Sequence, residues 1–147
     1  MTNSQKQQNQ MCGLFQVSYL INGDLFGGTS FSVSLLVYTP TKTVSGMGHV
    51  SQAVNPPFSL TSQLQGEFSY LCTMESCHIM ADLNGFCLPT LLVHGVPQAT
   101  QNTKLRMLLN EDWKSGTANF KFLRDNKWVE VENAKVQLME TKELTDL

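Results

Sequence analysis

The chain has 147 residues, a length that fits one domain of ordinary size. Hydrophobic residues make up 41% and charged residues only 15%, against about 25% in an average soluble protein, so disorder throughout the chain is excluded. The net charge of −2 gives no electrostatic reason to expect a nucleic-acid partner, and no apolar run approaches the ~20 residues of a membrane-spanning helix.

The N-terminal residues 1–11 are mostly polar and predict a disordered tail. Because this run has no apolar centre, it does not resemble a secretory signal peptide, and we expect a cytoplasmic protein, with non-classical export as the open alternative. In a reducing compartment the cysteines are expected to be free thiols, and a Cys72–Cys77 disulfide is expected only under oxidation. The four cysteines are Cys12, Cys72, Cys77 and Cys87.

The first third of the chain alternates apolar and polar residues with a period of two. Residues 15–21 and 31–37 both show this pattern, which is typical of strands with one buried face, and the Gly-rich loop between them predicts a hairpin. A third strand is expected over 42–53. It is interrupted by Gly46 and Gly48, which indicate either a bulge or close packing.

The middle of the chain is divided by the turn Asn55-Pro56-Pro57, whose prolines fix their backbone angles and lack N–H donors. A long strand is predicted from Leu60 to Tyr70. After a turn at 73–76, the chain is expected to return antiparallel over 77–83, and Pro89 favours an edge position for the apolar piece at 87–94.

The last third predicts strands over 104–110, 117–123, 128–131 and 134–139. Only 141–147 has a composition suited to a helix, and it is too short to hold one without packing. We therefore predict an all-β fold, an antiparallel β-sandwich or flattened barrel of about eight to nine strands. It forms a single domain over 12–140, between the tail at 1–11 and a C-terminal tail at 141–147.

Several motifs carry a resemblance to a known family. Ser45-Gly46-Met47-Gly48-His49, Gln52-Ala53-Val54-Asn55-Pro56-Pro57, Leu105-Arg106-Met107-Leu108 and the run from Asp112 to Phe120 are similar to small bacterial proteins catalogued only as a domain of unknown function, series number eighteen forty-two. The similarity extends from Gly13 to Leu138. The resemblance implies a bacterial source and a compact β domain, and it brings no reaction and no catalytic residues with it.

Thiol and imidazole groups gather in the middle of the chain, and these are the ligands that zinc prefers. They are Cys72, Cys77, His78, Cys87 and His94. The spacing lacks the close Cys-x2-Cys pairs of structural zinc sites, so buried cysteines and strand histidines are the favoured interpretation. We predict no metal and no cofactor.

Signatures of catalysis are missing from the sequence. No Gly-x-Ser-x-Gly elbow marks a nucleophile, and the acids Glu111-Asp112 and Glu130-x-Glu132 stand beside turns, where solvated carboxylates are ordinary. Gly27-Gly28 and Gly46-Met47-Gly48 lack the following Lys-Ser/Thr of a phosphate loop. The prediction is a protein that is not an enzyme.

Trp113 is the candidate for ligand contact, because a Trp in a loop with polar neighbours can stack on a sugar or a partner. A ligand site of Trp113, Asp112, Lys114 and Asn55 at one end of the fold is one interpretation. In the other, which we favour, Trp113 plugs one end of the β core.

Charge is distributed unevenly along the chain. Between Gln7 and Thr103 there is one base, Lys42, and four acids, which are Asp24, Glu67, Glu75 and Asp82. Outward positions made of Ser, Thr, Gln and Asn lack the charged side chains that protect sheets from pairing with one another. The leading hypothesis is therefore a protein that acts through protein contacts and forms homo-oligomers, by default a dimer. The alternative is a binding module for a small ligand or carbohydrate at the Trp113 loop.

Overall fold

The computed structural model describes residues 13–23, 28–54, 56–87, 91–98 and 100–143. These residues form ten strands: β1 (Leu14–Ile21), β2 (Thr29–Tyr38), β3 (Thr43–Gln52), β4 (Phe58–Cys72), β5 (Cys77–Cys87), β6 (Leu91–Val93), β7 (Val96–Gln98), β8 (Gln101–Asn110), β9 (Ser115–Arg124) and β10 (Lys127–Glu143). Over the same residues, no helix is long and apolar enough to cross a membrane.

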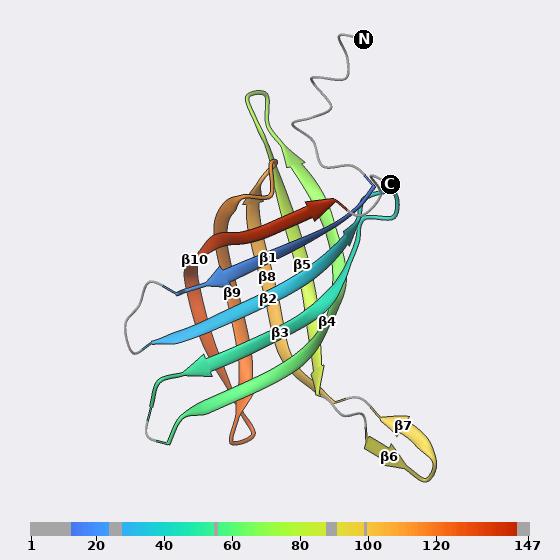
Figure 1. Ribbon diagram of the computed structural model, residues 1–147, viewed down its shortest axis with the longest axis vertical. Helices are drawn as coiled ribbons and strands as arrows, with labels where there is room; N and C mark the ends of the chain where they lie inside the picture. The colour runs from blue at the N-terminus through green and yellow to red at the C-terminus, as the bar shows by residue number, and fades with distance from the viewer. Residues whose placement is uncertain (1–12, 24–27, 55, 88–90, 99, 144–147) are drawn as a thin grey trace.

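Eight of the strands close into an antiparallel barrel in the order β1-β10-β9-β8-β5-β4-β3-β2 (Figure 1). Strands that follow one another in the chain are also neighbours in the barrel, except that β6 and β7 come between β5 and β8 in the sequence. Pairing of β1 with β10 closes the ring. The prediction of an all-β antiparallel fold with about eight to nine strands is confirmed, in its barrel form.

The period-two pattern of the sequence becomes the inside and outside of this barrel. The inward apolar residues of β1, β2 and β8 are all buried. Each large apolar side chain buried in this way contributes about 1.5–3 kcal/mol to folding. The inward apolar residues of these three strands are Phe15, Val17, Tyr19, Ile21, Phe31, Val33, Leu35, Val37, Leu105, Met107 and Leu109.

Aromatic rings and glycines fill the interior together. The Phe31 and Phe120 ring centroids lie 5.1 Å apart, and an added Cβ at Gly48 would come within 2.6 Å of the Phe31 ring. The register of β3 with both β2 and β4 is continuous. Of the two interpretations of Gly46 and Gly48, close packing is therefore the right one, because Gly48 faces the Phe31 ring and a Cβ at Gly46 would collide with the backbone carbonyl oxygen of Ser34 on β2.

The C-terminal strand extends further than the sequence predicted. Residues 141–143, assigned above to a tail with a helical composition, belong to β10 and pair with residues 15–17 of β1. Pairing across the barrel seam outweighs the weak helix propensity of so short a segment. The tail at 1–11 and residues 144–147 lie outside the described residues.

Substitution of Gly66 tests the tightness of the barrel wall. A Cβ at Gly66 would collide with the backbone carbonyl oxygen of Asp82 on β5, which cannot move without breaking the ladder. We expect Gly66→Ala to lower the free energy of unfolding by about 1–3 kcal/mol or more in denaturant titrations. The exposed neighbour offers a control, Gln65→Ala, and equal unfolding midpoints for the two variants would contradict this packing.

Candidate functional site

The upper end of the barrel in Figure 1 carries the β2–β3, β4–β5 and β8–β9 turns. Trp113, in the β8–β9 turn, has a φ of 65° and only 2% of its surface exposed. Its ring meets Phe15 at a centroid distance of 5.3 Å and Phe68 at 5.0 Å, both edge to face. The turn thus folds the indole back over the core, where it closes this end of the barrel.

A buried hydrogen bond holds Trp113 in this position. The Tyr19 hydroxyl donates to the Trp113 carbonyl oxygen over 2.7 Å. Burial raises the pKa of Tyr19 above its usual value of about 10, and the nearby Asp112 carboxylate adds to the shift. The Tyr19 hydroxyl therefore stays protonated and remains a hydrogen-bond donor to the Trp113 carbonyl oxygen.

The structure describes three of the four residues predicted for ligand binding, Asp112, Trp113 and Lys114, which are consecutive in the β8–β9 turn. Asp112 and Lys114 are exposed, with the Lys114 N–H donating to Asp112 Oδ1 over 3.0 Å, while the ring of Trp113 is enclosed and offers no open face for stacking. Asn55 lies outside the described residues. This arrangement matches a plug rather than a stacking platform.

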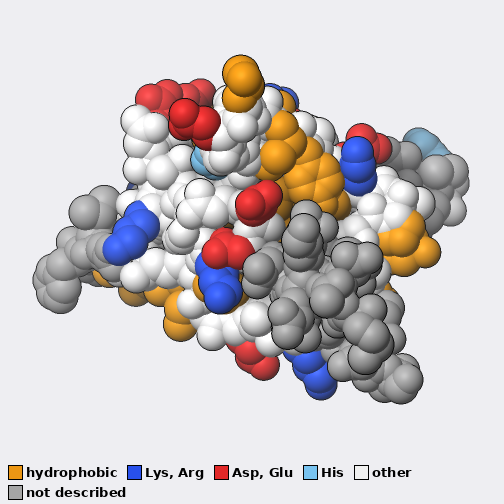
Figure 2. Space-filling model, turned by 90° about the horizontal axis from the view of Figure 1, so that it is seen from above, with side chains coloured by type: hydrophobic (Ala, Val, Ile, Leu, Met, Phe, Trp, Pro, Cys, Tyr) orange, Lys and Arg blue, Asp and Glu red, His pale blue; other side chains and the backbone are white. Residues whose placement is uncertain are grey.

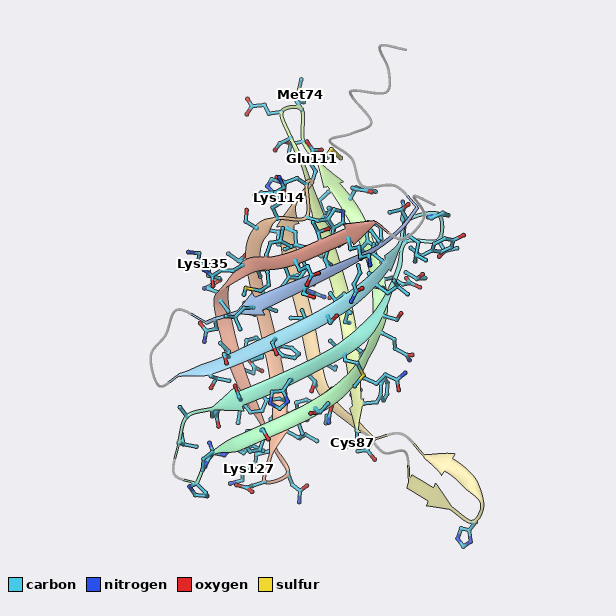
Figure 3. All side chains as sticks on the ribbon, viewed as in Figure 1. Met74, Cys87, Glu111, Lys114, Lys127 and Lys135 are labelled. Atoms are coloured by element: carbon cyan, nitrogen blue, oxygen red, sulfur yellow. A yellow bond between two sulfur atoms is a disulfide. The ribbon has the colours of Figure 1, made fainter. Side chains whose placement is uncertain are left out.

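A disulfide links Cys72 to Cys77, so these two cysteines are not the free thiols expected for a reducing compartment. They are directly opposite each other where β4 and β5 project beyond the barrel. In the turn between them, the backbone N–H groups of Glu75 and Ser76 donate to Thr73 Oγ1, and Met74 is fully exposed. Figure 3 shows Met74 at the tip, and Figure 2 shows hydrophobic and acidic side chains at this end.

Polar side chains occupy the interior near the lower end. Ser62, Asn102 and Thr103 are buried and bonded to one another, with the Ser62 hydroxyl 2.7 Å from both Asn102 Oδ1 and Thr103 Oγ1. The Asn102 amide also donates to the Cys87 sulfur over 3.5 Å. In the part of the chain that the structure describes, no group of His, Cys, Asp and Glu is suited to hold a metal. The alternation in the strand predicted from Leu60 to Tyr70 places Ser62 on the same face as Leu64, but the partners of Ser62 on β8 could not be read from the sequence.

The outer surface divides into two unlike halves. On β5, β8, β9 and β10, a shallow hollow contains charges of both signs, and Arg106 Nε donates to Asp82 Oδ1 over 2.7 Å across strands. Lys104 and Lys121 lie directly opposite each other on β8 and β9, and Glu130 is opposite Lys121 on β10. This half is an ordinary solvated surface with balanced charge.

The other half is the charge-poor face, defined as the outward residues of β1, β2, β3 and of β4 from Ser59 to Gln65. These positions carry no Lys, Arg, Asp or Glu. The Gln16 side-chain amide donates to Ser34 Oγ over 3.1 Å, so hydroxyls and amides here partly satisfy one another. A shallow hollow on this face is bordered by Leu20, Met47 and Met139 of β10.

Exposed apolar side chains are part of the same surface. Met47 is 44% exposed and Met139, at its border, 63% exposed, and Leu36 and Tyr38 on β2 are also exposed. In the sequence, this face is indicated by residues 7–103, a run of 97 positions that contains a single basic residue. Only the register shows that its strands form one continuous surface.

Comparison with known proteins places the chain in a family. The model described as domain of unknown function (DUF1842) matches residues 12–128. The chain belongs to this family. The match ends earlier than the resemblance read from the sequence, which reached Leu138, so most of β10 lies beyond the matched part. No curated protein matches this DUF1842 chain.

The stability of this DUF1842 protein at alkaline pH tests the hydrogen bond between Tyr19 and Trp113. Above pH of about 10 an unfolded Tyr19 loses its proton while the folded one retains it, so the unfolded state binds fewer protons and stability falls as the pH rises. We expect Tyr19→Phe to lower the free energy of unfolding by about 1 kcal/mol at pH 7. In thermal melts, the stability of this variant should fall less at alkaline pH than that of the unchanged protein.

The exposed Tyr38 gives a matched control. Tyr38→Phe should leave both the stability at pH 7 and its alkaline decline close to those of the unchanged protein. A Tyr19→Phe variant with the same alkaline decline as the unchanged protein would show that Tyr19 does not carry the effect.

Proposed function

We propose that this DUF1842 protein is a non-enzymatic module that acts through protein contacts and self-associates through its charge-poor face as a symmetric dimer. The observation that carries the proposal is the continuity of that face over four neighbouring strands without a Lys, Arg, Asp or Glu. A two-fold dimer needs one patch that is complementary to itself, and a neutral patch meets a second copy without charge repulsion.

The composition of the face favours burial in an interface. The cores of protein interfaces are depleted in charged residues and enriched in Met and Tyr, which are the types exposed here at Met47, Met139 and Tyr38. Hydroxyl and amide groups cost less to desolvate than charges do, and they find hydrogen-bond partners across an interface. The shallow hollow beside Leu20 and Met47 offers room for an exposed side chain of the second copy.

Closure of the barrel changes the way in which two copies of the chain are expected to associate. Weak protection of sheet edges was expected to allow edge-to-edge pairing, but each of the eight barrel strands is paired on both sides. A closed barrel has no free edge to offer. Association of the barrels is therefore proposed to occur through side chains on the charge-poor face.

A charge placed in the centre of the face tests the dimer. Met47→Lys would put an ammonium group between the copies, and we expect a mass of two chains to fall to one in light scattering at micromolar concentration. Thr117→Lys adds the same charge to exposed β9 in the charged half and should leave the mass unchanged. A single-chain mass for the unmodified protein at every concentration would remove the proposal.

We further propose that the protein works where the Cys72–Cys77 disulfide persists. Disulfides are rare in the reducing cytosol and stable in oxidising compartments, so this bond favours the export alternative over the cytoplasmic expectation. In protein taken from its native cells with thiols blocked at lysis, mass spectrometry should show Cys72 and Cys77 unlabelled and linked. Full labelling of both cysteines would favour the cytoplasm instead.

A further inference from the structure

One connection of the barrel is longer than closure requires. Strands β5 and β8 are antiparallel neighbours, which a short turn can join, as Asp125 and Asn126 alone join β9 to β10. Instead the chain uses residues 88–100 and forms the separate two-stranded sheet of β6 and β7. This hairpin, the arm, projects from the lower end of the barrel (Figure 1). The barrel strands are completely paired without it.

The register of the arm determines which backbone groups face outward. His94 and Gly95 form its turn with φ values of 53° and 79°, and the pairs are Val93 with Val96, Leu92 with Pro97 and Leu91 with Gln98. In a hairpin with a two-residue turn, the pair next to the turn is hydrogen-bonded and the following pair is not. The backbone groups of Leu92 and Pro97 therefore point away from each other, toward the two edges of the arm.

These two edges are not equivalent. Pro97 has no N–H, so the β7 edge lacks the donor that an added strand would need. On the β6 edge, Leu92 presents both an N–H and a C=O, and no other strand in the described ranges pairs there. An isolated two-stranded hairpin is marginal in water, and an open edge is a template for strand addition. The β6 edge is thus the side on which the arm can gain a strand.

We propose that the β6 edge pairs with the β6 edge of a second copy of this chain. Two β6 strands can lie antiparallel across a two-fold axis that passes between their Leu92 residues, and each Leu92 then donates to and accepts from the other. The result is a four-stranded sheet in the order β7-β6-β6-β7, with Pro97 on both outer strands. A second copy is the partner because this pairing is self-complementary and because residues 91–98 carry no charge to repel it.

This contact goes beyond the dimer through the charge-poor face, because it uses a different part of the chain. Its short strands bury little area, so the pairing should be weaker than the dimer and should depend on concentration. Where both contacts form, arms link dimers into larger assemblies. Where the charge-poor face is blocked, the arms alone join two copies.

Sedimentation of the full-length chain over a range of concentrations separates the two contacts. Met47→Lys should form pairs of chains only at high concentration, and the double variant Met47→Lys with Leu92→Pro should remain a single chain throughout. Leu92→Pro removes the outward donor while leaving the Val93–Val96 pair, as Pro97 does on β7. Met47→Lys with Leu92→Ala keeps the donor and should still pair. Unchanged melting temperatures would show that the barrels are intact.

The outcomes distinguish the arm from the face. Equal masses for Met47→Lys and the double Leu92→Pro variant at all concentrations would overturn arm pairing and leave the dimer proposal standing. A mass that falls with Leu92→Pro but not with Met47→Lys would support the arm and overturn the face. Loss of pairing with Leu92→Ala would overturn backbone pairing in favour of a side-chain contact, and a lone chain at every concentration for the unmodified protein would overturn both.

Discussion

Pairing between the first and last barrel strands is the constraint on which the rest of the structure depends. β1 and β10 come from the two ends of the described chain, and their ladder turns an open meander into a ring. Once the ring is closed, every inward residue faces the same interior, so Phe15 on β1 and Phe120 on β9 contribute to one core. Closure also satisfies the outer backbone groups of both strands, which an open sheet would expose.

A closed barrel has two ends, and different kinds of buried side chain lie near each of them. At the upper end the seal is Trp113, whose ring packs on Phe15 and Phe68 while its carbonyl accepts the Tyr19 hydrogen bond. Near the lower end, Ser62, Asn102 and Thr103 form a polar group that is buried and internally bonded. An aromatic plug contributes apolar area, whereas polar groups inside a core require that each one finds a partner. Residues with apparent functional chemistry, a loop Trp and inward polar side chains, thus have structural roles here.

Because buried side chains fill the interior and Trp113 closes the upper end, the proposed function rests on features of the outer surface. The charged half resembles the surface of most soluble proteins, while the charge-poor face and the arm are the parts that folding of the barrel does not explain. Both are neutral, and both suit a second copy of the chain, one through side chains and the other through backbone. The β4–β5 turn, which the Cys72–Cys77 disulfide closes, is a third exposed feature, at the upper end and away from the arm.

The sequence by itself determined the all-β class, the approximate strand count, most turns and the inward residues, because the side-chain period of a strand is two and its boundaries are marked by Gly, Pro and Asn. It also located the charge-poor region, since charge is read directly from composition. Tertiary structure alone decided that the sheet closes, that residues 141–143 join β10 and that Trp113 turns inward, which the sequence had left as one of two interpretations. Each of these depends on contacts between residues brought together only by the register of the strands or by the closed ring, and local periodicity contains no information about such pairs.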